Sequence, residues 1–417
     1  SLIAGGFKNN TESLKVLVNE GPKDVLNLIE MGVNFDKKED GSYDLTLEGG
    51  HSRHRIFHHK DNTGYELVEK LLAQAQTFEN ITLLDQAIVC DLKQAVNGFS
   101  LDVLRGEEHL YFNCTDCVLA TGGIGRVYEY TTNSAIATGD GITLAYRMGA
   151  KIKNLHLVQF HPTAFANKDR ECFLISESVR GEGAYLLNAN HQRFMSRYDD
   201  RLELAPRDVV SHCIIEESHR LHDNHFYLDI THKDADFLKK RFPMIYSKLL
   251  EEGIDITKDL IPVYPCQHYL MGGIDVALNG ESSIPHLYAA GECSHTGVHG
   301  NNRLASNSLL EAIVFARQIA EDINVRTEQN EKLSVIPYAF SLPEGTEPIP
   351  HGIRTEIRAI MQKSHFVFPD TMAAIAGFER IQELKNMIEK GNFFVNVDYI
   401  EARSLATVAY LILKEVI

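Results

Sequence analysis

Several short segments of the chain place charged or imidazole side chains beside glycines. They supply Glu48, then Gln159 and His161, then Ser176, Glu177 and Arg180, and finally Arg207, His268 and Arg303. Arginines and histidines that converge on one cleft would suit a dicarboxylate, because a guanidinium pairs with a carboxylate through two hydrogen bonds and an imidazole N–H can complete the clamp. The residue types therefore favour a site for a small anionic substrate.

Each of these residues also has an ordinary structural interpretation. A histidine in an apolar stretch, such as His161, is more often a core histidine whose hydrogen bonds are satisfied. Arg207 could pair with the aspartate that follows it, and Glu177 and Arg180 could form a surface ion pair on one helical face. Glu48 could lie in a solvated loop. The co-occurrence of all of them with glycine-bounded turns favours the functional interpretation.

Residues 287–323 predict a strand, a polar loop and a helix. Leu287–Ala290 is an apolar run that stops at Gly291-Glu292, as a strand does where a ligand approaches the backbone. Ser308 and Glu311 are spaced as a capping box, in which both side chains bond backbone N–H groups. A helix N-terminus carries about half a positive charge. We therefore expect this one, which follows Arg303, to face an anion, although an ordinary strand-to-helix crossover stays possible.

The first half of the chain predicts an α/β sheet. Apolar runs predict strands at 81–84, 88–92 and 111–120, and the last runs into Thr121 and Gly122, the pattern at the carboxyl edge of a doubly wound sheet, where ligands bind. Asp140 follows and is placed to cap a helix or to hold a ribose hydroxyl. Residues 1–40 hold helical patterns divided by a Gly-Pro pair and show no strand followed by Gly-x-Gly-x-x-Gly.

The composition bounds the class of protein. A chain of 417 residues with 44% hydrophobic content is long enough for about two or three domains with real cores. The formal net charge of −16 argues against nucleic acid or an anionic membrane as the main partner, because both bind basic surfaces. The sequence shows neither a signal peptide nor an apolar run of about 18 residues. We expect a soluble, cytoplasmic protein.

The pattern of cysteines also favours the cytoplasm. Seven of them are scattered without the spacing of a disulfide framework, which suits reducing conditions. The close pair Cys114 and Cys117 has no second pair or histidine set to complete a zinc site, so we interpret it as structural and expect no metal.

Changes in the pattern of residue types divide the chain into domains. Residues 1–157 form the first part of an α/β domain, residues 158–271 a second domain, and residues 272–325 a return to the first. Residues 326–350 have no period and form a linker. Residues 351–417 predict a helical hairpin or bundle.

Six ordered motifs carry a resemblance to a known family. They are QFHPT (159–163), SESVRGEGA (176–184), APRD (205–208), HYLMGG (268–273), AAGE (289–292) and GNNRLASNSLLE (300–311). Together they resemble the flavoprotein family of the L-aspartate oxidases and the succinate dehydrogenase and fumarate reductase flavoprotein subunits. The resemblance implies an α/β fold, with a doubly wound FAD-binding domain that is N-terminally incomplete, an inserted α+β capping domain, a C-terminal helical domain, and noncovalently bound FAD.

The resemblance also implies residue roles. Arg207 matches the catalytic arginine, and Glu177 and Arg180 match a relay through which this arginine exchanges protons. A relay is physically reasonable, because an isolated guanidinium with a pKa above about 12 is a poor acid or base. The residues that match the substrate site are Glu48, Gln159, His161, Ser176, His268 and Arg303. The residues that match flavin contacts are Thr121, Gly122, Asp140, Glu292, Asn307, Ser308 and Leu309.

Glu48 decides between the branches of this family. A carboxylate there can pair with the ammonium of a 2-amino dicarboxylate, whereas the succinate and fumarate branch has no such need. The resemblance then implies oxidation of L-aspartate to iminosuccinate, with O2 or fumarate as acceptor, as the first step of NAD biosynthesis through quinolinate. Quinolinate synthase is a candidate partner. The first alternative is a succinate dehydrogenase or fumarate reductase flavoprotein subunit with an iron–sulfur partner.

Some residues depart from the family pattern. Ser176 stands where threonine is common, Met271 is typical of the dehydrogenase branch, and KSHFVFPD (363–370) lacks the Gly-Ile-x-Arg pattern expected in the tail. The resemblance also implies that the family's first βαβ unit, with the turn that holds the FAD pyrophosphate, lies outside this sequence. A second alternative is therefore a catalytically silent fragment without FAD.

Overall fold

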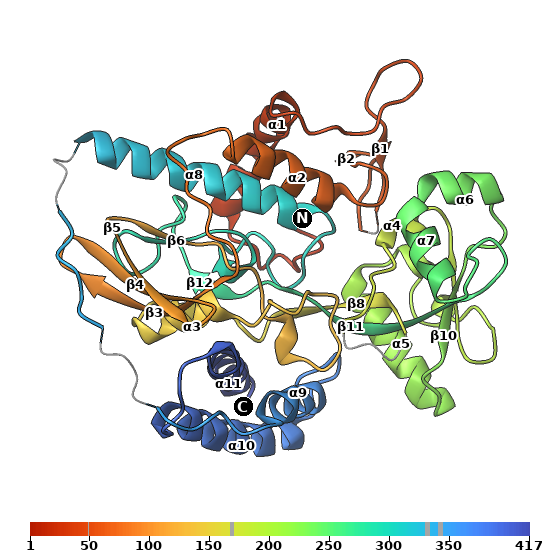
Figure 1. Cartoon of the computed structure of the whole chain (residues 1–417). Helices are drawn as coiled ribbons and strands as arrows, with labels where there is room; N and C mark the ends of the chain where they lie inside the picture. The colour runs from red at the N-terminus through yellow and green to blue at the C-terminus, as the bar shows by residue number, and fades with distance from the viewer. Residues whose placement is uncertain (49, 167–170, 330–333, 341–344) are drawn as a thin grey trace.

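The computed structural model describes residues 1–48, 50–166, 171–329, 334–340 and 345–417. Short strands form a central layer between two groups of helices, and a separate lobe projects from one end of this layer (Figure 1). Among the described residues, no helix is both long and apolar enough to cross a membrane.

The central layer contains the parallel pair expected at the ligand-binding edge. Strand β6 (Cys117–Leu119) pairs in parallel with β13 (Leu287–Ala289), and a second sheet joins β7 (Ile152–Lys153), β12 (Gly273–Asp275) and β14 (Ser294–His295). Helix α3 (Asp140–Arg147) covers these strands, and short 3-10 turns follow at Gly125–Val127 and Gly291–Cys293. The prediction of a strand that ends near Glu292 is confirmed.

A three-stranded antiparallel sheet flanks this layer. It consists of β3 (Ala87–Ala95), β4 (Gly98–Arg105) and β5 (Glu108–Cys114). The predicted single strand 111–120 is wrong, because its first part belongs to β5 and its second part to β6 in another sheet. The predicted strand 81–84 is also wrong. Its apolar side chains are exposed, and its backbone pairs with no strand among the described residues.

The projecting lobe is built around its own core. Its antiparallel sheet has the order β8 (Val158–Phe165), β11 (Ile261–Leu270), β10 (Phe226–Asp229) and β9 (Tyr185–Leu187). The helices of the lobe are α4 (Glu177–Gly181), α5 (Arg207–Leu221), α6 (Ala235–Arg241) and α7 (Pro243–Glu251), with 3-10 turns at Met195–Arg197 and Leu202–Leu204. The buried apolar residues of this core all lie between Phe165 and Val263.

One outer layer of helices comes from two distant parts of the chain. It contains α1 (Thr11–Glu30), α2 (Thr63–Ala75) and α8 (Asn307–Gln329), beside the small sheet β1 (Leu45–Thr46) and β2 (Ile56–Phe57). Helix α1 runs through Gly21 and Pro22, so the predicted division there is wrong. Buried Gly21 lets α1 approach Leu310 of α8 closely, and this packing stabilises a helix that proline alone would interrupt.

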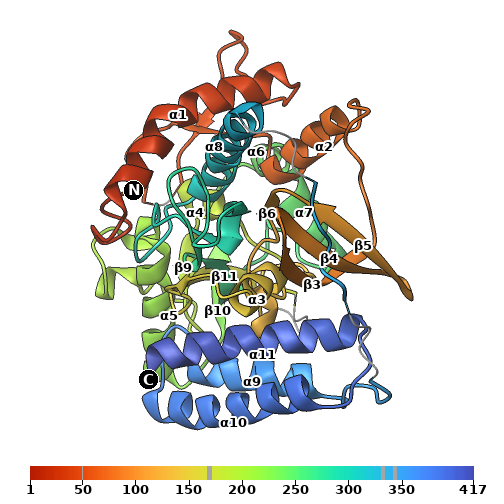
Figure 2. The same cartoon turned by 90° about the vertical axis from the view of Figure 1, so that its left-hand side faces the viewer.

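The other outer layer is the C-terminal helical region, which confirms the expected helices. It contains α9 (Ile353–Ser364), α10 (Thr371–Lys390) and α11 (Val397–Val416), and α11 faces the central layer and contacts α3 (Figure 2). Asp370 and Asn396 cap α10 and α11. The segment that departs from the family pattern still docks, because His365 bonds the Tyr128 hydroxyl at 2.7 Å and Phe366 packs on Phe160.

Candidate active site

A buried chain of ionised groups occupies the junction of the lobe and the central layer. Arg207, the first residue of α5, donates from Nε to Glu177 Oε2 at 2.6 Å, and Arg180 donates from Nη2 to Glu177 Oε1 at 2.8 Å. Glu177 is 2% exposed and Arg180 is 1% exposed, so the interpretation of these two residues as a surface pair is wrong. Both oxygens of one carboxylate therefore join the two guanidinium groups.

The charges of Arg207, Glu177 and Arg180 stabilise one another. Burial would raise the pKa of Glu177, but Arg207 and Arg180 together hold it below its ordinary value. Burial lowers the pKa of Arg180, and the Nη1 group of Arg180 also donates to the carbonyl of Glu203 at 2.6 Å. The carboxylate is thus ionised and held in place between its two partners.

His161 presents an unused hydrogen-bond donor to the same site. Its Nδ1 accepts from the backbone N–H of Thr163 at 3.2 Å, so the neutral ring carries its proton on Nε2. Within the described part of the chain, Nε2 has no hydrogen-bond partner, although His161 is completely buried. Burial and the nearby Arg207 hold the pKa of His161 well below its ordinary value. The expectation of a satisfied core histidine is therefore wrong.

His268 and Arg303 lie beside His161. The two imidazole rings are 5.0 Å apart, and Arg303 Nη2 lies 3.0 Å from His268 Nε2. Because arginine only donates, His268 Nε2 accepts and its Nδ1 donates to Thr132 Oγ1 at 2.7 Å. Burial lowers the pKa of Arg303 to about 10. Both histidines are neutral here, and the guanidinium is held by the ring of Tyr269, 4.6 Å from its centre.

Glu48 reaches the site from the N-terminal part of the chain. Ser306 donates from its hydroxyl to Glu48 Oε2 at 2.9 Å. Burial and the neighbouring Glu177 raise the pKa of Glu48, while Arg207, Ser306 and Arg303 oppose that rise. The side chain is half-buried, so its interpretation as part of a solvated loop does not describe its surroundings.

Gln159 and Ser176 are more strongly engaged with protein groups than the substrate-ligand role implies. Gln159 accepts from Arg207 Nη1 at 3.1 Å and donates to Asn302 Oδ1 and to the carbonyl of Arg303. The Ser176 hydroxyl caps α4 by accepting from the N–H of Ser178. Gln159 thus ties α5 to the loop before α8, and Ser176 fixes the start of the helix that carries Glu177.

The predicted capping box at the start of α8 is wrong. Ser308 accepts from Arg303 Nη1 at 2.9 Å instead of starting the helix, which begins at Asn307. Glu311 turns inward and is 1% exposed, where it bonds Tyr269, His299 and the Thr296 hydroxyl. Local spacing allowed a cap, but the buried partners satisfy this carboxylate better than a single backbone N–H would.

The residues that match flavin contacts gather at the carboxyl edge of β6 and β13. The backbone of Ala290 bonds the Leu119 carbonyl at 3.0 Å, which brings Thr121, Gly122 and Glu292 together. A Cβ at Gly123 would lie 2.2 Å from Glu292 Oε1, so glycine there makes room for this carboxylate. Burial raises the pKa of Glu292 to about 7, which lets it donate to or accept from a ligand hydroxyl.

Further observations concern the fit of FAD to these residues. Asp140 starts α3, and its Oδ1 atom is buried without a hydrogen-bond partner in the described ranges. Asn307, at the start of α8, donates to the Ser1 hydroxyl, and Leu309 is 41% exposed. The unpartnered Asp140 oxygen and the Glu292 carboxyl with its raised pKa fit the hydroxyl groups of FAD, and the N-terminus of α8 fits its electron-rich edge.

Sequence reasoning missed several residues that hold the site together. Asn302 bonds both Gln159 and Asp208, Thr132 orients His268, and Ser306 holds Glu48. The consecutive asparagines of GNNR were the one available signal, because amide side chains in a loop often serve as hydrogen-bond bridges. Thr132 and Ser306 give no such signal.

Comparisons with known proteins agree with this geometry. Residues 2–309 match a family described as an FAD binding domain. The chain is 39% identical to an L-aspartate oxidase of Acinetobacter baylyi, covering 99% of this chain and 79% of that protein. It is 47% identical to an L-aspartate oxidase of Clostridium perfringens, covering 78% of this chain and 73% of that protein.

Solved structures give the same fold. A quinol-fumarate reductase with menaquinol molecules superposes with a TM-score of 0.88 and 27% identity, over 99% of this chain and 78% of that one. The Mycobacterium smegmatis Sdh1 in complex with UQ1 has a TM-score of 0.78 and 29% identity, over 99% of this chain and 75% of that one. The overall arrangement is therefore that of an FAD-binding flavoprotein.

Proposed function

The chain belongs to the L-aspartate oxidase family, and we propose that it oxidises L-aspartate to iminosuccinate with noncovalently bound FAD, in NAD biosynthesis. The observation that carries this proposal is the meeting of Arg207, Glu177 and Arg180 with neutral His161 and with Glu48 in one buried site. FAD, when bound, supplies the two-electron acceptor for such an oxidation.

The balance of charge in the site favours this substrate. Three guanidinium groups, from Arg180, Arg207 and Arg303, face the carboxylates of Glu177 and Glu48. With both carboxylates ionised, these five groups carry one net positive charge, which complements the single net negative charge of L-aspartate with its two carboxylates and one ammonium. Succinate lacks the ammonium, and its two negative charges would match the site only with Glu48 protonated.

The residues suggest how the substrate is held. In the part of the chain that the structure describes, His161 Nε2–H and Arg303 Nε–H have no hydrogen-bond partner, so each can donate to a substrate carboxylate oxygen. Glu48 pairs with the ammonium, and its raised pKa makes it a better proton acceptor than an exposed glutamate. Binding at two carboxylates and one ammonium fixes the substrate Cα in one orientation.

The hydrogen-bonded arginines offer a path for a proton. We assign Arg207 to the substrate side, and Glu177 links it directly to Arg180. When fumarate is the electron acceptor, Arg207 is placed to deliver a proton and to regain one through Glu177. The likeness to a quinol-fumarate reductase supports fumarate as an acceptor alongside O2, and it also supports a succinate dehydrogenase or fumarate reductase subunit as the second candidate.

The chemistry of the product points to its user. An imine hydrolyses in water, so we propose that a cytoplasmic enzyme that condenses it directly, of the quinolinate synthase type, consumes it. None of the seven cysteines, all of which lie in the described ranges, forms a disulfide, which supports a reducing compartment.

Flavin reduction tests the proposed function. The purified chain is incubated with FAD, freed of unbound ligand, and mixed without oxygen with L-aspartate or with succinate. We expect the retained flavin absorbance to bleach with L-aspartate and to change far less with succinate. Bleaching by succinate alone would favour the second candidate, and failure to retain FAD would favour a silent fragment.

A further inference from the structure

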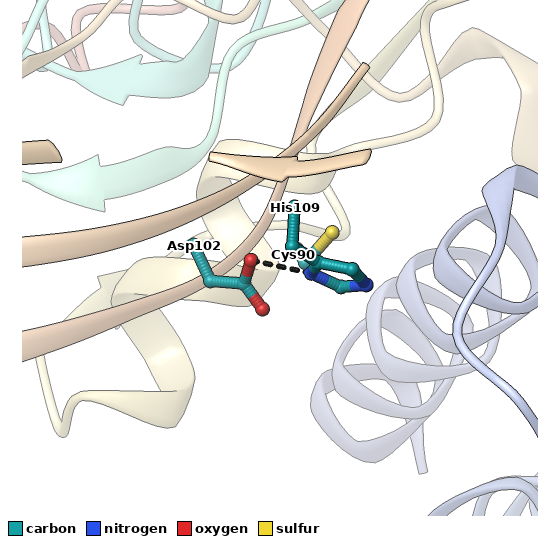
Figure 3. Close-up of side chains that lie close together, drawn as sticks. All are labelled: Cys90, Asp102 and His109. Atoms are coloured by element: carbon teal, nitrogen blue, oxygen red, sulfur yellow. Dashed lines mark hydrogen bonds and ion pairs between the residues drawn. The ribbon is translucent and has the colours of Figure 1, made fainter. Parts of the chain in front are cut away.

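Three side chains with metal-ligand chemistry converge on the sheet of β3, β4 and β5. Cys90 of β3, Asp102 of β4 and His109 of β5 each offer one ligand atom, and these atoms all lie within 4.8 Å of one another (Figure 3). The carboxylate of Asp102 lies 2.7 Å from His109 Nδ1. Sequence spacing gave no sign of this group, because its members come from three strands and lack a short repeat.

The strand register explains why the three side chains share one face. His109 pairs with Leu104, and Tyr111 pairs with Asp102, so His109 lies diagonally across from Asp102 on the same side of the sheet. On the other neighbour, the register shifts between Val89 and Asp91, which leaves Cys90 as the extra residue of a β-bulge. The bulge turns the Cys90 side chain towards Asp102.

The burial of this group and its one partly exposed member can accommodate a small cation. Cys90 and Asp102 are 2% and 5% exposed, so a carboxylate is buried beside a thiol. His109 is only partly buried and lies on β5, the edge strand of this sheet, which gives an ion a way in. One thiolate, one imidazole and one carboxylate form a ligand set that Zn²⁺ accepts, with water in the fourth position.

We propose that Cys90, Asp102 and His109 form a binding site for a divalent metal ion of the Zn²⁺ type. Zn²⁺ binds sulfur at about 2.3 Å and nitrogen at about 2.0 Å, so ligand atoms around one ion lie about 3.5 Å apart. Side-chain movement of about 1 Å closes the group around an ion. Binding releases the thiol proton of Cys90 to solvent, and the imidazole stays neutral by keeping its proton on the nitrogen that does not bind.

The site also has a structural consequence. The carbonyl of Cys90 accepts from Arg403 Nη2 of α11 at 2.6 Å, and Cys90 packs against Ile400 of the same helix. An ion that joins β3, β4 and β5 therefore stiffens the surface on which the C-terminal helical region docks. In this proposal the ion has a structural role.

Cobalt provides the sharpest test, because Co²⁺ replaces Zn²⁺ and its bond to a thiolate gives a charge-transfer absorption band. We expect the full chain to show this band at one Co²⁺ per chain, to lose it on addition of Zn²⁺, and to lack it in Cys90→Ser. His109→Ala, which removes the partly exposed ligand, should weaken Zn²⁺ binding more than about tenfold. Zn²⁺ should also raise the unfolding temperature of the wild type but not of these variants.

Matched controls separate this site from adventitious binding by other residues. Cys213→Ser removes another buried free thiol, and His225→Ala removes a surface histidine paired with an aspartate. Both variants should keep the cobalt band and the rise in unfolding temperature. The proposal is overturned if the wild type shows no thiolate band, or if Cys90→Ser and His109→Ala bind Zn²⁺ as tightly as the controls do.

Discussion

Replacement of Glu48 by glutamine tests the proposed recognition of the substrate ammonium. Glutamine has nearly the same shape and can still accept from the Ser306 hydroxyl, which lies 2.9 Å from the carboxylate. The substitution removes one negative charge from a site whose other charged groups are three arginines and Glu177. The fold should therefore survive while the ion pair with the substrate is lost.

The expected magnitude follows from the type of bond. A hydrogen bond to a charged group contributes about 1.5–3 kcal/mol, which corresponds to a loss of about 10- to 150-fold in kcat/KM for L-aspartate. Fumarate reduction, which involves no ammonium, should change by less than about threefold. The unfolding temperature should stay the same or rise, because the variant no longer buries a carboxylate whose pKa is raised by burial.

The assay compares two substrates on one enzyme preparation. Steady-state oxidation of L-aspartate and reduction of fumarate are measured for the wild type, for Glu48→Gln and for Glu252→Gln, an exposed glutamate at the end of α7. The control variant should match the wild type in both reactions. Equal losses for L-aspartate and fumarate in Glu48→Gln would refute the reasoning, because the residue would then act on the site as a whole.

Three further outcomes follow from the same contacts. Glu177→Gln leaves Arg207 and its partner arginine without a shared carboxylate, so denaturant unfolding should show a loss of about 3–5 kcal/mol and fumarate reduction should slow sharply. Burial holds the pKa of both site histidines below 6.5, so the unfolded chain binds more protons at lower pH. The contribution of these two histidines to the free energy of unfolding should therefore be complete above pH 6.5 and fall as the pH drops below it. His161→Gln should reduce the slope of the unfolding temperature against pH, measured in melts at several pH values. Tyr269→Phe keeps the ring beside Arg303 but removes the hydroxyl that bonds Glu311, so it should lower the free energy of unfolding by about 1 kcal/mol. Because the ring is then less firmly held, the KM for L-aspartate should rise more than kcat falls. An unchanged KM would show that this hydroxyl does not position Arg303.

Several features of the fold could be predicted because their signals are local. The apolar run before Gly291 is a strand, the three C-terminal helices follow from their apolar period, and the ordered motifs give the FAD-binding fold. Boundaries and breaks were less reliable. Pro22 does not end α1, because the packing of this helix against Leu310 outweighs the low helix propensity of proline.

The residue types of the site were available from the sequence, but the protonation and the hydrogen-bond partners of these residues were not. The sequence supplied Arg207, Glu177, His161 and Glu48 with the chemistry to bind a dicarboxylate. Only the tertiary structure decided that His161 leaves a donor unused and that Gln159 holds Arg207.

The same limit applies to Glu311 and to the group at Cys90. Glu311 was spaced to cap its own helix, yet it is buried against Tyr269 and His299 from other segments. Protonation, burial and hydrogen-bond choice depend on the free energy of groups brought together from distant parts of the chain. Sequence spacing specifies which groups exist, and the packed fold decides which of them meet.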